Sequence, residues 1–202
     1  LTAFEQYKQF PEFKLVNSHY TLEDFKSIFF WEWLHRFIGR MIGIVFFFPF
    51  VFFLIKKKLS RKVILQCLVL FGLGALQGFL GWFMVKSGLI DKPNVSHYRL
   101  AIHLAAAFTT FSYILWVVFG IVLQRRNIRA NRSKGVYRLS NIVLLLISVQ
   151  IIFGAFVAGL KAGYIYPEWP LMAGEFMPRQ VAESIGNSGI SSLFNEMVSV
   201  QF

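Results

Sequence analysis

Four long apolar runs set the pattern of this chain. Residues 37–55, 63–85, 100–123 and 139–160 are almost free of charge, and each run has between 19 and 24 residues. A helix needs about 20 apolar residues to cross the hydrocarbon core of a bilayer. The pattern therefore predicts an all-α, polytopic membrane protein with four transmembrane helices that form a bundle.

The segments outside these runs are more polar. Residues 21–30 mix apolar with charged positions and open with Thr21 and Asp24, a pair typical of a helix start, so we expect an interfacial helix there. The tail carries three prolines and several glycines and serines, which predict an outer loop with at most a short helix. The expected divisions are an outer-side loop and interfacial helix (1–30), the four-helix transmembrane bundle (31–160) and an outer-side loop (161–202).

Composition supports the membrane class. Hydrophobic residues make up 56% of the 202 residues and charged residues only 15%, which excludes a soluble domain and a disordered chain. The single cysteine, Cys67, lies inside the second apolar run, so a disulfide scaffold is excluded as well.

The charges predict membrane topology rather than nucleic-acid binding. The chain has 21 basic and 10 acidic residues, a net charge of +11. Eleven of the basic residues, and no acidic residue, lie in two loops: Lys56, Lys57, Lys58, Arg61 and Lys62 in one, and Arg125, Arg126, Arg129, Arg132, Lys134 and Arg138 in the other. The positive-inside rule places both loops on the cytoplasmic or matrix side, and the two ends of the chain and loop 86–99 outside.

A short pattern occurs twice. Gln77 and Gly81 on the second apolar run match Gln150 and Gly154 on the fourth, and a Lys-x-Gly follows each pair, at residues 86–88 and 161–163. We interpret this repeat as an internal duplication.

Two histidines are the strongest candidates for chemistry. His35 precedes the first apolar run, and His103 lies near the start of the third. These two runs cross in the same direction, so both imidazoles are expected at a similar depth in the outer leaflet. Two such histidines can hold a haem iron between helices. A hydrogen bond between helices is the alternative for each, and a zinc site would need further ligands.

Neighbouring residues extend this candidate site. Gly39 and Gly43 follow His35 on one helical face, where they would leave room for a porphyrin or serve only for close helix packing. Arg99 lies one turn before His103, and Arg36 and Arg40 lie close to His35. Each arginine could bind a haem propionate or extend its charge to the membrane surface.

Glu32 lies three residues before His35. It could pair with Arg36, orient the histidine, or act on a substrate. The other two histidines are weaker candidates. His97 is about 240° around the helix from His103, so both cannot face one ligand and we expect His97 at the interface. We interpret His19 as an ordinary loop histidine.

Three motifs in order carry a family resemblance. The stretches 31–40 (Trp-Glu-Trp-Leu-His-Arg-Phe-Ile-Gly-Arg), 76–89 and 95–104 closely resemble the haem A synthase family in its mitochondrial and alpha-proteobacterial form. Residues 4–8, 11–13, 157–163 and 169–172 fit the same family, so nearly the whole chain is covered.

The resemblance implies an eight-helix protein of two similar halves, of which this chain would supply spans two to five. It implies an oxidoreductase that converts the C8 methyl of haem O to a formyl group, giving haem A for cytochrome oxidase biogenesis. His35 and His103 would hold the haem O substrate, and Glu32 matches the family's important acid. A haem b cofactor would be bound by a second histidine pair that is not present here.

The resemblance also implies a cellular location and partners. We expect an integral protein of a bacterial cell (inner) membrane or mitochondrial inner membrane, in contact with lipid, with haem O synthase and an electron-transfer protein as partners and no nucleic acid. Monomer and homo-oligomer are both left open. The main alternative is a bis-histidine b-type cytochrome for transmembrane electron transfer, and a transporter or structural assembly protein would bind no haem.

Two departures limit what is carried over from the family. This chain reads Tyr-Pro-Glu-Trp-Pro at 166–170, where the family has a polar pair before an aromatic-proline step, so no role of that pair is transferred. The paired loop cysteines of some bacterial relatives are absent, and no disulfide relay is expected.

Overall fold

The structure, a computed structural model, describes residues 2–88, 95–125, 133–166, 168 and 170–202. Within these ranges the regular elements are all helices, and four of them are long and apolar enough to cross a membrane. The predicted all-α membrane fold is therefore confirmed. Asp91, Arg126, Arg129, Arg132, Pro167 and Trp169 lie outside the described residues.

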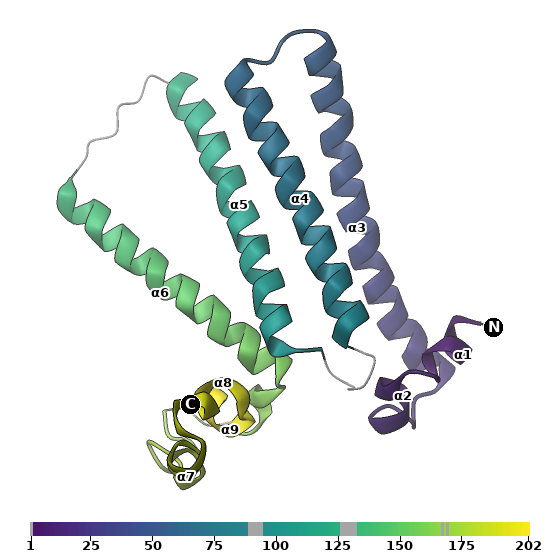
Figure 1. The fold of residues 1–202 in the computed structure, drawn as a ribbon, viewed down its shortest axis with the longest axis vertical. Helices are drawn as coiled ribbons and strands as arrows, with labels where there is room; N and C mark the ends of the chain where they lie inside the picture. The colour runs from purple at the N-terminus through teal and green to yellow at the C-terminus, as the bar shows by residue number, and fades with distance from the viewer. Residues whose placement is uncertain (1, 89–94, 126–132, 167, 169) are drawn as a thin grey trace. The chain divides into compact units, whose positions relative to one another are not determined.

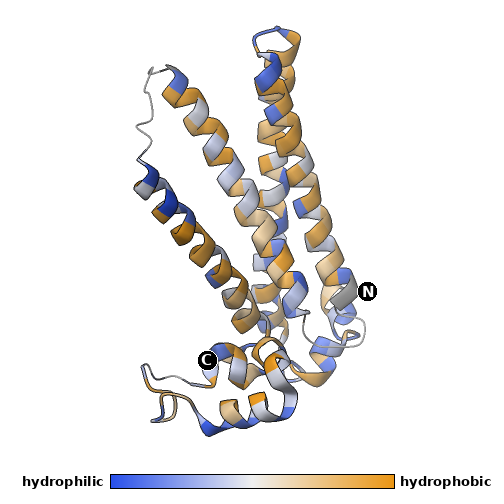
Figure 2. Cartoon of the chain, turned by 60° about the vertical axis from the view of Figure 1, so that its left-hand side comes forward, coloured by the Kyte–Doolittle hydropathy of each residue, from blue (hydrophilic) through white to orange (hydrophobic). Residues whose placement is uncertain are grey.

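The long helices are α3 (Leu22–Ile55), α4 (Arg61–Gly88), α5 (His97–Arg125) and α6 (Lys134–Gly159) (Figure 1). Apolar residues occur along the whole length of each (Figure 2), and many of them are exposed. On α3, for example, Ile42 and Phe48 keep 65% and 66% of their surface exposed. A helix that is hydrophobic all round belongs in lipid or in a protein core, and these side chains are not in a core.

The described helices fall into two compact units, residues 1–94 with 106–129 and residues 95–105 with 130–202. In the first unit, α3 and α4 pack against each other through aromatic rings. Phe71 of α4 lies with its ring centroid 4.7 Å from that of Phe46 and 5.4 Å from that of Phe50.

The start of α3 is firmly defined. Thr21 and Asp24 form the predicted capping box: the Thr21 N–H donates to Asp24 Oδ2 at 2.9 Å, and the Asp24 N–H donates to Thr21 Oγ1 at 3.4 Å. The helix then runs unbroken to Ile55, so the predicted interfacial segment and the first span are one helix. Two short helices, α1 (Ala3–Tyr7) and α2 (Pro11–Leu15), precede it, and Phe4 and Tyr7 pack on Phe25.

The second unit has its core where α6 meets the start of α5. Ala101, Ala155, Phe156 and Val200 are buried together there. Tyr98 extends the contact by donating its hydroxyl hydrogen to Asn195 Oδ1 at 2.8 Å. The tail thus packs on the membrane helices through specific contacts.

The prediction of at most a short helix in the tail is wrong. The tail contains η1 (Ala162–Tyr164), α7 (Arg179–Ser188), η2 (Gly189–Ser191), α8 (Ser192–Asn195) and α9 (Met197–Gln201). Pro178 is the N-cap of α7, and Gly189 follows its last residue with φ +63°. Proline suits a helix start and glycine a helix end, so two of the residues that predict a loop instead mark the boundaries of a helix.

Candidate functional site

One face of α3 carries most of the predicted site. Its positions follow one another at spacings of three or four residues, which keeps them on neighbouring turns of the same side. The predicted residues on this face are Glu32, His35, Arg36, Gly39, Arg40 and Gly43, all in the first unit and all exposed. The face is therefore open for a ligand or for another helix.

Glu32 has a partner on this face. The guanidinium of Arg36 donates to Glu32 Oε1, one helical turn away, with about half of each side chain exposed. This is the pairing that the sequence left open beside the two functional roles of Glu32. A carboxylate near the hydrocarbon region is expected to lie beside such a cation, because an unpaired charge is costly there.

Gly39 and Gly43 make no close packing contact with the described part of the chain. A Cβ atom built on either residue would meet no atom within 4 Å. Close helix packing through small residues would place a neighbouring backbone against them. Room for a porphyrin beside His35 and packing against a further helix therefore both stay predictions for these two glycines.

The other predicted residues lie on α5. Arg99 and His103 are one turn apart on the same side, and both are half-buried in the second unit. Because His35 and His103 belong to different units, their pairing around one iron stays a prediction.

His97 has a packing role that the sequence did not predict. Its ring centroid lies 5.3 Å from that of Phe156, nearly perpendicular to it. Its backbone also crosses α6 closely, because a Cβ atom on Gly159 would lie 2.7 Å from His97 Cβ and 2.8 Å from His97 Cα. The side-chain Nε2 is buried without a hydrogen-bond partner. His97 therefore joins the start of α5 to the end of α6.

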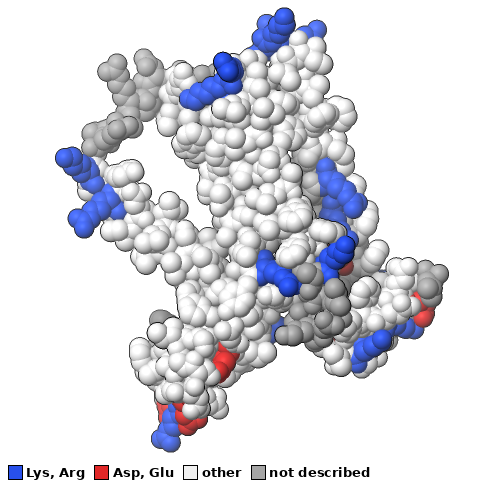
Figure 3. Space-filling view, viewed as in Figure 1, with Lys and Arg blue, Asp and Glu red and all other residues white. Residues whose placement is uncertain are grey.

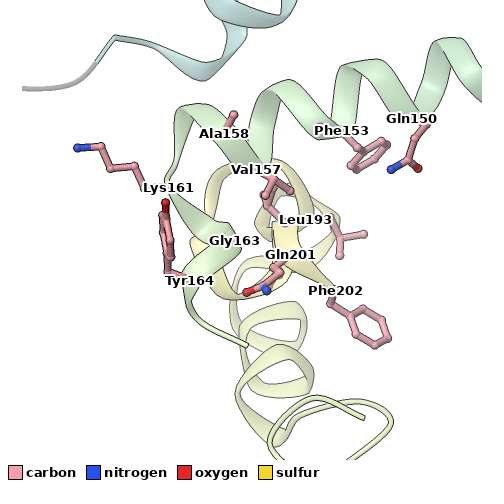
Figure 4. A pocket seen from close by; sticks show the side chains of 13 residues that line it. Gln150, Phe153, Val157, Ala158, Lys161, Gly163, Tyr164, Leu193, Gln201 and Phe202 are labelled. Atoms are coloured by element: carbon pink, nitrogen blue, oxygen red, sulfur yellow. The ribbon is translucent and has the colours of Figure 1, made fainter. Parts of the chain in front are cut away.

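A cavity of about 1020 Å³ in the second unit was also missed (Figure 4). Phe153 and Val157 of α6 form one side, and Leu193, Gln201 and Phe202 of the tail form the other. Gln201 is held by Tyr166, which donates its N–H to Gln201 Oε1 at 2.9 Å and accepts from Gln201 Nε2 at 2.7 Å.

The internal repeat could have located this cavity. The residues of its second copy, Gln150, Gly154, Lys161 and Gly163, all line the cavity wall. The lining is mostly apolar with a few polar groups, and the volume lies at the upper end of ligand pockets. Such a site suits a large apolar ligand with polar ends.

The described residues contain no cluster of three or more histidine, cysteine, aspartate or glutamate side chains that could hold a metal ion. A haem iron needs no such cluster, because two histidine ligands would be enough to hold it.

A sequence model of the COX15-CtaA family, described as cytochrome oxidase assembly protein, matches residues 1–202. The chain belongs to this family. The resemblance found in the three motifs is thereby confirmed over the whole chain.

The chain is also similar to individual proteins named Heme A synthase. The Heme A synthase of Flavobacterium johnsoniae is 51% identical over 99% of this chain, and that of Flavobacterium psychrophilum is 52% identical over 89%. The Heme A synthase of Nitrosospira multiformis is 42% identical over 98% of the chain. The chain spans 59%, 53% and 56% of the length of these three proteins. No solved structure matches the chain significantly.

Proposed function

We propose that this chain forms part of a haem A synthase. The observation that carries the proposal is that 99% of this chain aligns with a protein named Heme A synthase, at 51% identity. The chain spans just over half of that relative, so the activity belongs to the whole protein.

The proposed substrate is haem O. Its C8 methyl group is oxidised to a formyl group through two successive hydroxylations. Each hydroxylation takes its oxygen from water and passes two electrons to the electron-transfer protein proposed below, and the resulting gem-diol loses water. The product, haem A, serves cytochrome oxidase. This chain contributes mainly by holding the substrate in position, which is how a protein adds most to such chemistry.

Each predicted residue has a proposed role. His35 and His103 bind the substrate iron from two helices, and Glu32 takes a proton from, or stabilises charge at, the oxidised methyl. Arg36, Arg40 and Arg99 pair with haem propionates, with Arg36 shared with Glu32. The open positions at Gly39 and Gly43 support this proposal, since a Cβ atom there would meet no neighbouring side chain or other helix within 4 Å in the described part of the chain.

A haem b cofactor would transfer electrons one at a time, and this chain does not offer a second histidine pair for it. His19 is exposed before α3, and His97 is packed against Phe156. We therefore assign haem b to other parts of the protein.

We also propose haem O synthase and an electron-transfer protein as partners, a bacterial cell or mitochondrial inner membrane as location, and an outer-side position for both ends of the chain.

Replacing Glu32 tests the catalytic assignment. In the full-length enzyme, Glu32→Gln is expected to keep haem bound but to stop the reaction after the first hydroxylated intermediate, as measured by mass analysis of extracted haems. Glu23→Gln is the matched control, because Glu23 pairs with Lys26 on the same helix and is well exposed.

Comparison of Arg36→Gln with Glu32→Gln distinguishes a chemical role of Glu32 from a structural one. If Glu32 acts on the substrate, Arg36→Gln retains some formation of haem A. If the Glu32–Arg36 ion pair is only structural, both variants lose haem to the same extent, and the proposed role of Glu32 is wrong.

A further inference from the structure

The turn between α3 and α4 gathers five cations within seven residues: Lys56, Lys57, Lys58, Arg61 and Lys62. All five are exposed, and Figure 3 shows basic side chains over this end of α3 and α4. The ion pairs of the described residues involve none of them. Their positive charge is therefore available to a partner outside the chain.

The backbone of the turn concentrates this charge. Lys58 N–H donates to Phe53 O and Lys57 N–H donates to Leu54 O, both at 3.0 Å, which is the pattern of a Schellman motif. Lys57 occupies its left-handed position with φ 51°, where glycine is the easier residue. A lysine held at some strain in this position points to a use for its charge.

An apolar groove begins directly beneath the turn. Leu59 of the turn, Phe53, Pro49 and Phe46 of α3, and Cys67 of α4 line a cavity of about 190 Å³. The lining continues along α3 to Val45, eight residues from Phe53 and so about 12 Å along the helix axis. The groove therefore runs from the cationic turn into the apolar zone.

We propose that this turn and groove bind one anionic phospholipid from the adjacent leaflet. The phosphate lies among the lysines of the turn, and the first carbons of one acyl chain lie in the groove between α3 and α4. Basic residues next to a membrane helix attract anionic lipids. The positive-inside rule accounts for the charge alone, but it accounts neither for Lys57 in a glycine position nor for the groove. This lipid site uses none of the residues proposed to bind haem.

The test is a lipid titration of the purified membrane protein in detergent, with bound lipid counted by native mass spectrometry. Dioleoyl phosphatidylglycerol is the anionic probe and dioleoyl phosphatidylcholine is the neutral one. Wild-type protein is expected to retain one phosphatidylglycerol more tightly than phosphatidylcholine.

Two charge variants test the headgroup contact. Lys57→Gly combined with Lys58→Gln is expected to weaken phosphatidylglycerol binding about 10- to 30-fold, because each basic residue near the surface is worth about a factor of five. The glycine also relieves the backbone, so a folding defect does not explain the loss. Lys134→Gln combined with Arg138→Gln removes equal charge at the start of α6 and should leave the tight site unchanged. An equal loss in both double variants would overturn the proposal.

Two size variants test the groove. Cys67→Phe fills it and is expected to abolish the tightly retained lipid, whereas Leu68→Phe places the same aromatic side chain at a neighbouring exposed position and should not. Unchanged phosphatidylglycerol retention in Cys67→Phe would show that no acyl chain lies in the groove, and would equally overturn the proposal.

Discussion

The crossing of His97 and Gly159 gives the sharpest prediction for stability. Gly159→Ala would place a Cβ atom 2.7 Å from His97 Cβ and 2.8 Å from His97 Cα. The second contact is with the backbone, so a side-chain rotation cannot relieve it. The start of α5 and the end of α6 must therefore move apart, and the burial of Phe156 between them is reduced.

The expected change in stability on Gly159→Ala is the balance of two opposing free-energy contributions. Forcing extra atoms into a packed contact costs about 1–3 kcal/mol. Alanine is better than glycine in a helix by about 1 kcal/mol, which offsets part of that cost. Gly154→Ala on the same helix isolates the second term, because its Cβ would meet no atom within 4 Å. The two variants should then differ by about 1–3 kcal/mol, with Gly159→Ala the less stable.

Amide hydrogen exchange measured by mass spectrometry gives the local stability directly. Peptides from the first turns of α5 and the last turns of α6 should exchange about 5- to 150-fold faster in Gly159→Ala than in Gly154→Ala, since 1.4 kcal/mol corresponds to a factor of ten. Equal exchange in both variants would refute the close crossing of these helices.

Three further predictions concern single contacts. Thr21→Ala removes the capping box and should destabilise the first turn of α3 by about 1 kcal/mol, seen as faster exchange of the amides after residue 21. Burial raises the pKa of the Tyr7 phenol while the hydrogen bond from Asn17 lowers it, so the packing of α1 and α2 should weaken as pH rises through this raised pKa. Asn17→Ala should raise the Tyr7 pKa further in an ultraviolet titration corrected with Tyr7→Phe, and a lower pKa would contradict this. Tyr98→Phe loses its bond to Asn195 and should cost about 0.5–1.5 kcal/mol in thermal unfolding, with exposed Tyr137→Phe neutral as the control.

Sequence reasoning was most successful where one physical requirement dominates. The need to bury about 20 apolar residues in lipid predicted all four long helices. The Thr21 and Asp24 pair predicted a helix start, because both side chains can satisfy free backbone N–H groups there. These signals are local, so they can be read without knowing what packs against them.

The features that were missed depend on contacts between distant residues. Pro178 and Gly189 mark the ends of α7, a helix that buries Val181 completely against the rest of the tail, and this packing is not visible in the local sequence. The crossing of His97 and Gly159 joins residues far apart in the sequence, and no local pattern predicts it. Gln150 and Lys161 belong to the internal repeat, but the cavity that they line is closed by residues of the tail that lie far along the sequence.

The most direct test of the haem proposal is the haem content of the full-length protein. We would record visible spectra of the oxidised and reduced protein, extract every haem and determine its mass, and compare His35→Ala, His103→Ala and the loop control His19→Ala. We expect haem O, hydroxylated haem O or haem A beside haem b, with only the substrate haem lost in the first two variants. Haem b alone, unchanged by turnover and retained in both variants, would contradict it.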